Sequence, residues 1–125
     1  MENLPDGLSN LGKDAFASSK NLPENLNLPL YLSRVSSSSF KGTNIRTLNI
    51  QGYTENIEEE SFAYCEDLTT VKFGKYVESI GSRAFLFCRS LRNITILNPE
   101  PPTIESDAFA WCDNLSEVGL GEGVV

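Results

Sequence analysis

The sequence contains no histidine, which removes the most common general base and the most common metal ligand in proteins. It has no apolar run long enough to cross a bilayer, and none of the paired Cys-x-x-Cys spacing that zinc sites use. Neither G-x-x-x-x-G-K-[ST] nor G-x-G-x-x-G, the two glycine-rich phosphate-binding patterns, is present. We therefore predict that the protein is not an enzyme, with no catalytic residue, metal site or cofactor.

Basic residues are scarce, since ten Lys and Arg stand against 17 Asp and Glu, for a net charge of −7. Nucleic acids and anionic membranes repel such a surface, so we expect neither as a partner and no direct insertion into a membrane. The N-terminus also lacks the basic segment and apolar stretch of a signal peptide. With 40% hydrophobic and 22% charged residues, the composition is that of an ordinary folded domain.

What the sequence does contain is a repeat of 22 to 24 residues. Five phenylalanines mark it: Phe16, Phe40, Phe62, Phe85 and Phe109. An apolar residue stands five positions before each phenylalanine, and a small residue stands directly before it. Because several columns recur in phase, we infer a stack of one repeated unit. Its period lies within the range of leucine-rich repeats, roughly 20–29 residues.

The last three units carry further columns after the phenylalanine: a cysteine, then a leucine, then two apolar residues in alternation. The alternation, as in Val71 and Phe73, predicts a short strand with every second side chain inward. One strand per unit would stack into a parallel sheet with neighbours about 4.8 Å apart. Cys65, Cys88 and Cys112 are predicted to be small buried residues under a turn, with a disulfide between adjacent coils as the alternative.

Together these columns predict a solenoid of mainly-β or α/β type that spans residues 1–125 as a single domain. We expect a right-handed leucine-rich-repeat superhelix of about five coils, with a short parallel sheet on its concave side. The opposite side should carry a helical turn or a second short extended piece near each Ala-Phe pair. The chain starts and stops near the same point of its repeat, without a recognisable polar cap. This predicts a slice of a longer array, with self-associating or partner-covered ends as the alternative.

With these columns in place, the chain resembles the BspA-like family of leucine-rich repeats. The family pattern is approximately L-x-x-I-x-L-P-x-x-V-x-x-I-G-x-x-A-F-x-x-C-x-x-L. Residues 71–91, VKFGKYVESIGSRAFLFCRSL, follow it most closely, with Gly74 where proline is usual. The resemblance implies a curved solenoid of cell-surface or secreted proteins from host-associated bacteria and some protists. It also implies adhesion or protein recognition, and it supplies no catalytic residues.

The outward positions of the predicted strands are the first candidates for binding. They form polar columns across the concave face, where solenoids commonly bind ligands. The alternative is that these side chains only solvate the sheet. The candidates are Thr47, Asn49, Thr70, Lys72, Asn93, Thr95 and Glu117.

A second candidate is a column of aromatic residues two positions after the phenylalanine, namely Tyr64, Phe87 and Trp111. Ser18 and Gly42 stand there in the first two units. Three aromatics in register would form a stripe able to stack on sugars or to anchor a protein partner. The alternative is that the rings pack on one another and shield the turn beneath.

From these features we predict a non-enzymatic scaffold of the cell surface or the extracellular space, which binds a protein or glycan ligand in adhesion. The alternative is a passive spacer whose repeats hold another domain away from a surface.

Overall fold

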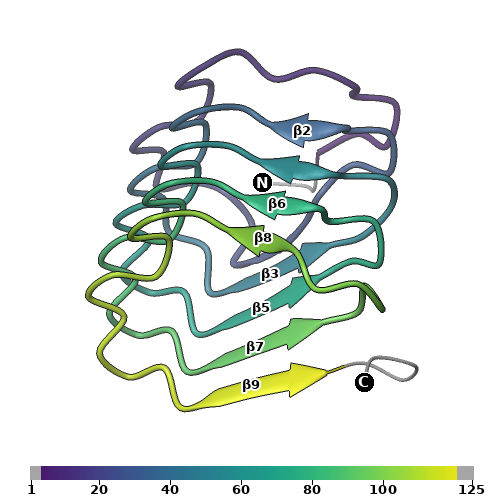
Figure 1. Ribbon diagram of the computed structural model, residues 1–125. Helices are drawn as coiled ribbons and strands as arrows, with labels where there is room; N and C mark the ends of the chain where they lie inside the picture. Colours follow the sequence, from purple (N-terminus) through teal and green to yellow (C-terminus); the bar gives the residue numbers. More distant parts are fainter. Residues whose placement is uncertain (1–3, 121–125) are drawn as a thin grey trace.

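The computed structural model describes residues 4–120, and within this range nine strands form two parallel sheets around one core (Figure 1). The first sheet has the order β1-β3-β5-β7-β9 and the second has the order β2-β4-β6-β8. Strands of the first sheet are β1 (Asn25–Asn27), β3 (Thr47–Ile50), β5 (Thr70–Phe73), β7 (Asn93–Ile96) and β9 (Glu117–Leu120). Strands of the second sheet are β2 (Arg34–Val35), β4 (Asn56–Ile57), β6 (Ser79–Ile80) and β8 (Thr103–Ile104).

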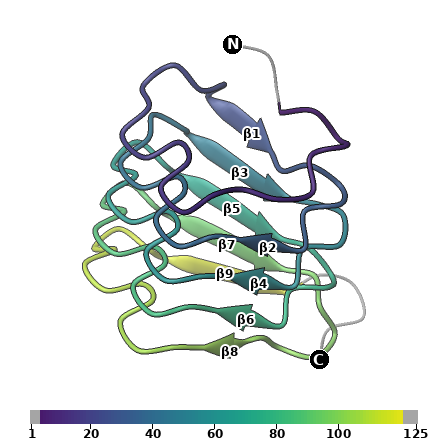
Figure 2. The ribbon, with the colours of Figure 1, turned by 90° about the horizontal axis from the view of Figure 1, so that it is seen from above.

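The chain alternates between the two sheets and so winds as a solenoid. Strands of the two sheets run in opposite directions on opposite sides of each coil (Figure 2). Residues 4–120 contain no helix that could cross a membrane, and in fact no helix at all. The fold is therefore mainly β. Near the Ala-Phe pairs we expected either a helical turn or a second short extended piece. The extended piece is present, and its strands form the second sheet.

The strands of the first sheet form because their apolar residues alternate. In β5, Val71 and Phe73 are buried, whereas Thr70 and Lys72 point outward. The parallel register aligns the same repeat positions of successive coils, for example Thr47 with Thr70. The predicted parallel sheet is confirmed. The number of full turns is about four instead of five, because no strand of the second sheet precedes Phe16 within the described residues.

The five repeat phenylalanines form a continuous stack through the core. Successive ring centroids lie 5.2 to 5.3 Å apart, and the rings are nearly parallel. Phe40, Phe62 and Phe85 are completely buried, whereas Phe16 and Phe109 at the two ends are partly buried. Burial of each such ring stabilises the fold by roughly 1.5–3 kcal/mol, so adjacent coils depend on one another for stability.

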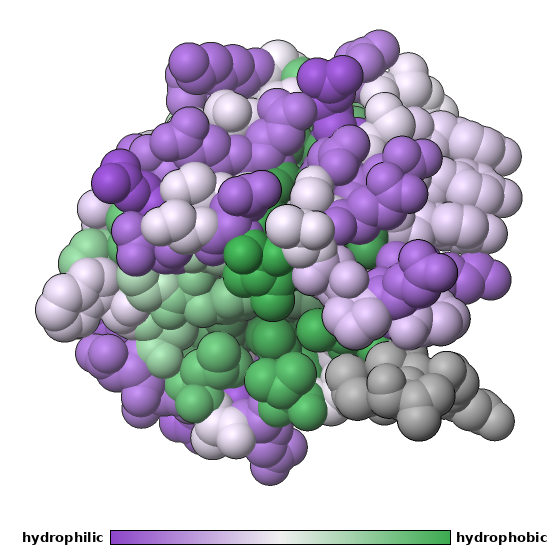
Figure 3. Space-filling model, in the orientation of Figure 1, coloured by the Kyte–Doolittle hydropathy of each residue, from purple (hydrophilic) through white to green (hydrophobic). Residues whose placement is uncertain are grey.

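The last coil has apolar side chains that no further coil covers within the described residues. Ile104 of β8 is 50% exposed and Val118 of β9 is 58% exposed. Figure 3 shows an apolar area over this end of the solenoid. The equivalent residues of the preceding coil, Ile80 and Ile94, are buried because they lie between two coils.

Candidate functional site

The predicted polar columns lie on the outer surface of the first sheet. Thr47, Thr70, Asn93 and Glu117 are aligned by the register in one column, and Asn49, Lys72 and Thr95 in the other. At the N-terminal end of the sheet these side chains also bond to their neighbours: Thr47 Oγ1 donates to Asn25 Oδ1 at 2.8 Å. Of the seven candidates, Asn49 and Lys72 also line a groove beside the sheet.

A ladder of exposed tyrosines lies just beyond the C-terminal ends of β1, β3 and β5. We call Tyr31, Tyr53 and Tyr76 the tyrosine ladder. Their ring centroids lie 6.0 and 5.2 Å apart, and the side chains are 61%, 54% and 42% exposed. This column was not predicted from the sequence, although a signal was present: each tyrosine stands nine residues before a repeat phenylalanine.

Glycines in the turns before Tyr53 and Tyr76 allow the coils to approach closely. Gly52 has a φ of +74°, and a Cβ there would lie 2.4 Å from the Leu30 carbonyl oxygen. A Cβ at Gly74 would lie 2.3 Å from the Ile50 carbonyl oxygen. Directly after Gly52, the Tyr53 amide donates to the Leu30 carbonyl at 2.9 Å. The close contact holds Tyr53 directly over the preceding coil.

The tyrosine ladder forms one wall of a groove of about 520 Å³. This volume lies within the range of ligand-binding clefts, roughly 300–1,000 Å³. The groove combines apolar surface with amide and ammonium groups. Its lining comprises the tyrosine ladder with Leu30, Asn49, Ile50, Gln51, Gly52, Lys72, Gly74, Lys75 and Leu97.

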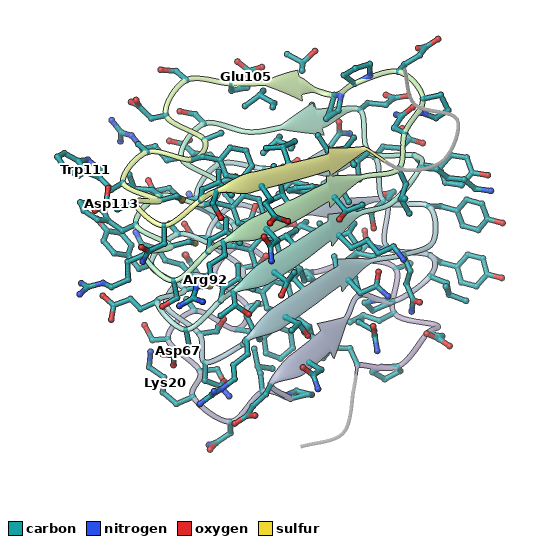
Figure 4. All side chains as sticks on the ribbon, turned by 90° about the horizontal axis from the view of Figure 1, so that it is seen from below. Lys20, Asp67, Arg92, Glu105, Trp111 and Asp113 are labelled. Carbon is teal, nitrogen blue, oxygen red and sulfur yellow. The ribbon has the colours of Figure 1, made fainter. Side chains whose placement is uncertain are left out.

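The aromatic stripe of Tyr64, Phe87 and Trp111 forms a second ladder. Ring centroids lie 5.3 and 5.6 Å apart, with interplanar angles of 19° and 6°. The rings therefore stack on one another, and Lys41 Nζ lies 5.6 Å from the centroid of the Tyr64 ring. A hydrogen bond to Glu60 raises the pKa of Lys41. Trp111 is 62% exposed and projects from the edge of the molecule (Figure 4).

Comparison with known proteins identifies the repeat unit. A family model described as a BspA type leucine rich repeat region matches residues 2–116 in six copies. The chain belongs to this family. No curated protein and no solved structure matched the chain significantly. BspA-type repeats form scaffolds and are typically not enzymes.

In this BspA-type chain, the aromatic stripe occupies backbone positions that favour glycine. The φ angles of Tyr64, Phe87 and Trp111 are 61°, 57° and 62°, and Gly42 has a φ of 70° at the same position of its unit. The left-handed conformation costs a residue with a side chain about 1–2 kcal/mol. Stacking of two aromatic rings stabilises by about 0.5–1.5 kcal/mol per pair. Ring stacking therefore offsets part of the backbone strain in the stripe.

We predict that Phe87→Gly is more stable than Phe87→Ala by about 1 kcal/mol. Both substitutions remove the ring contacts, but only glycine relieves the left-handed strain. Urea unfolding of both variants measures the difference. The matched control is Thr95, a strand residue of the same coil, where alanine should be more stable than glycine by about 0.5–1 kcal/mol. An alanine variant at Phe87 at least as stable as the glycine variant would contradict this account.

The three repeat cysteines of the BspA-type units are free thiols. Each Sγ donates to a phenylalanine carbonyl of the preceding coil at 3.1 to 3.2 Å. Burial raises the pKa of Cys65, while a hydrogen bond with Cys112, together with burial, raises that of Cys88. Cys65 and Cys88 are thus protonated and buried, which makes them poor nucleophiles. Within residues 4–120, no three His, Cys, Asp or Glu side chains group to hold a metal.

Proposed function

We propose that this chain is a non-enzymatic recognition module of a cell-surface or secreted protein, and that it binds a protein partner at the groove beside the tyrosine ladder. The observation that supports this proposal is that three large aromatic side chains stack in register on the surface, each at least 42% exposed. Clusters of exposed aromatic residues mark interaction sites, where tyrosine is enriched among the residues that dominate binding energy.

The stacking geometry favours a protein over a glycan at this groove. A sugar that stacks on an aromatic side chain needs an open ring face. Both faces of Tyr53 are occupied, by Tyr31 and Tyr76, and Lys75 Nζ lies 5.6 Å from the Tyr76 centroid. The ladder instead presents ring edges and hydroxyl groups, which suit the mixed polar and apolar contacts of protein interfaces.

The test is a binding screen of the purified chain against extracellular matrix proteins and a glycan array, followed by Tyr53→Ala. This variant removes the middle ring of the tyrosine ladder, and we expect about tenfold weaker binding or more, as for a central aromatic contact. Trp111→Ala is the matched control, since it removes an equally exposed aromatic side chain from the other ladder. It should bind like the wild type, and both variants should keep a melting temperature near the wild-type value.

Other outcomes would overturn the proposal in distinct ways. Binding lost only in Trp111→Ala would move the site to the aromatic stripe. Binding to glycans alone would contradict the choice of a protein partner. If no protein or glycan binds saturably, the chain is a spacer, and its role is to hold another domain at a distance.

A further inference from the structure

We propose that the groove selects an acidic partner, namely an extended peptide segment rich in Asp and Glu. This inference rests on the proposed function for the location of the site, and it adds the chemistry of the ligand. Three features of the groove support it: the charge of its lining, the parts of the tyrosine rings that remain open, and the length of the ladder.

The charge of the groove is opposite in sign to that of the whole chain. Lys72 and Lys75 line the groove, and none of its lining residues is acidic. The chain as a whole has 17 acidic and 10 basic residues. Each of the ion pairs found among residues 4–120 uses other cations, so neither lysine has a carboxylate partner there. No carboxylate among residues 4–120 neutralises either ammonium group, although Lys75 Nζ also lies 5.6 Å from the Tyr76 ring centroid, so both can pair with carboxylates of a ligand.

The tyrosine ladder adds to this preference for anions. The face of an aromatic ring carries partial negative charge and its edge carries partial positive charge. Because stacking covers both faces of Tyr53 and one face each of Tyr31 and Tyr76, a ligand at the centre of the ladder meets ring edges and phenolic hydroxyl donors. The amides of Asn49 and Gln51 supply further donors, since each uses one hydrogen for a bond within the fold and retains a second.

The dimensions of the groove indicate an extended segment in preference to a single small anion. The tyrosine ladder spans three coils, with centroid separations of 6.0 and 5.2 Å. An extended peptide advances about 3.3 Å per residue, so three to four residues match this length. The partly exposed apolar groove residues Leu30 and Leu97 would contact the aliphatic parts of such a segment.

The direct test uses defined probes and does not require the natural partner. A hexapeptide of alternating Glu and Val is titrated into the full chain, and the amide NMR signals of Gly52 and Gly74 report on the groove. We expect saturable shifts, about tenfold weaker binding of the matched Gln-Val hexapeptide, and weaker binding as NaCl rises from about 0.05 to about 0.5 M. A hexamer of galacturonate tests whether an acidic glycan substitutes for the peptide.

Two double variants locate the charges that matter. Lys72→Gln with Lys75→Gln should weaken binding of the Glu-Val peptide about tenfold or more. Lys13→Gln with Arg92→Gln is the matched control: it likewise removes two positive charges, but from exposed residues outside the groove lining, and Arg92 directly precedes β7 (Figure 4). The control should bind within about twofold of the wild type, because neither residue lines the groove and exposed charges outside it are partly screened by salt.

The remaining outcomes separate this inference from the proposed function. Equal binding of the Glu-Val and Gln-Val peptides, or equal loss in the two double variants, would overturn selectivity for acidic segments. Preference for galacturonate over the peptide would overturn the peptide class. A partner protein that requires Tyr53 but tolerates loss of both groove lysines would leave the proposed function standing and refute this inference alone.

Discussion

Phe85→Ala is expected to lower the free energy of unfolding by about 3–5 kcal/mol, the cost of deleting a large buried aromatic side chain. Phe85 is fully buried. Its ring stacks on Phe62 and Phe109 at 5.3 Å and meets Phe73 edge-on at 5.6 Å. The substitution therefore removes three aromatic contacts and leaves a cavity between coils. A domain stability of about 5–15 kcal/mol makes this a large fraction of the total.

Urea unfolding followed by circular dichroism measures the loss. In a solenoid each coil contacts only its neighbours, so the damage should begin at the coils on either side of Phe85. Phe87→Ala is the internal comparison, because that ring is partly exposed and its removal should cost less. A Phe85→Ala variant that melts like the wild type would show that the phenylalanine stack is not the core of the fold.

Gly52→Ala is expected to destabilise the chain by about 2–4 kcal/mol, from left-handed strain and overpacking together. A Cβ at this position would lie 2.4 to 2.8 Å from backbone atoms of Leu30. Backbone atoms cannot move aside as a flexible side chain can, so the two coils must separate at this corner. The same shift would displace Tyr53 and weaken binding at the groove.

Gly12→Ala is the matched control for this effect. A Cβ at Gly12 meets no atom within 4 Å, and its φ lies outside the left-handed range. We expect its stability to change by less than about 0.5 kcal/mol. Thermal unfolding of the two glycine variants checks the contrast. Equal melting temperatures would contradict the close approach of coils at Gly52.

The register of the first sheet was predictable because the sequence shows both the two-residue alternation within each strand and the repeat that relates successive coils. Alternation within a strand assigns each side chain to one face, and a slip by one residue would reverse that assignment. The repeat then places equivalent residues of successive coils beside one another, as with Val71 and Ile94. The second sheet was harder to predict. Its strands have only two residues, too few for a periodic pattern, and hydrogen bonds between coils hold them.

The tyrosine ladder escaped prediction for a different reason. Tyrosine is common both inside and on the surface of proteins, so its type alone does not place it. Its spacing matched the repeat, but the direction of each ring depends on the turn at its corner of the coil. That turn includes the close contact at Gly52, which joins residues 22 positions apart. The aromatic stripe was predicted as a column, and packing of its rings on one another was one of the two interpretations, but its left-handed backbone was not predicted.

By itself, the sequence determined that this protein is a repeat solenoid of the BspA type with one continuous phenylalanine core. It did so because burial in a repeated unit demands the same residue types at the same spacing in every coil. Only the tertiary structure decided which outward residues meet in one place. Tyr53, Lys72 and Asn49 share a groove because corner and strand positions of neighbouring coils converge there, and that convergence depends on backbone geometry that side-chain types do not encode.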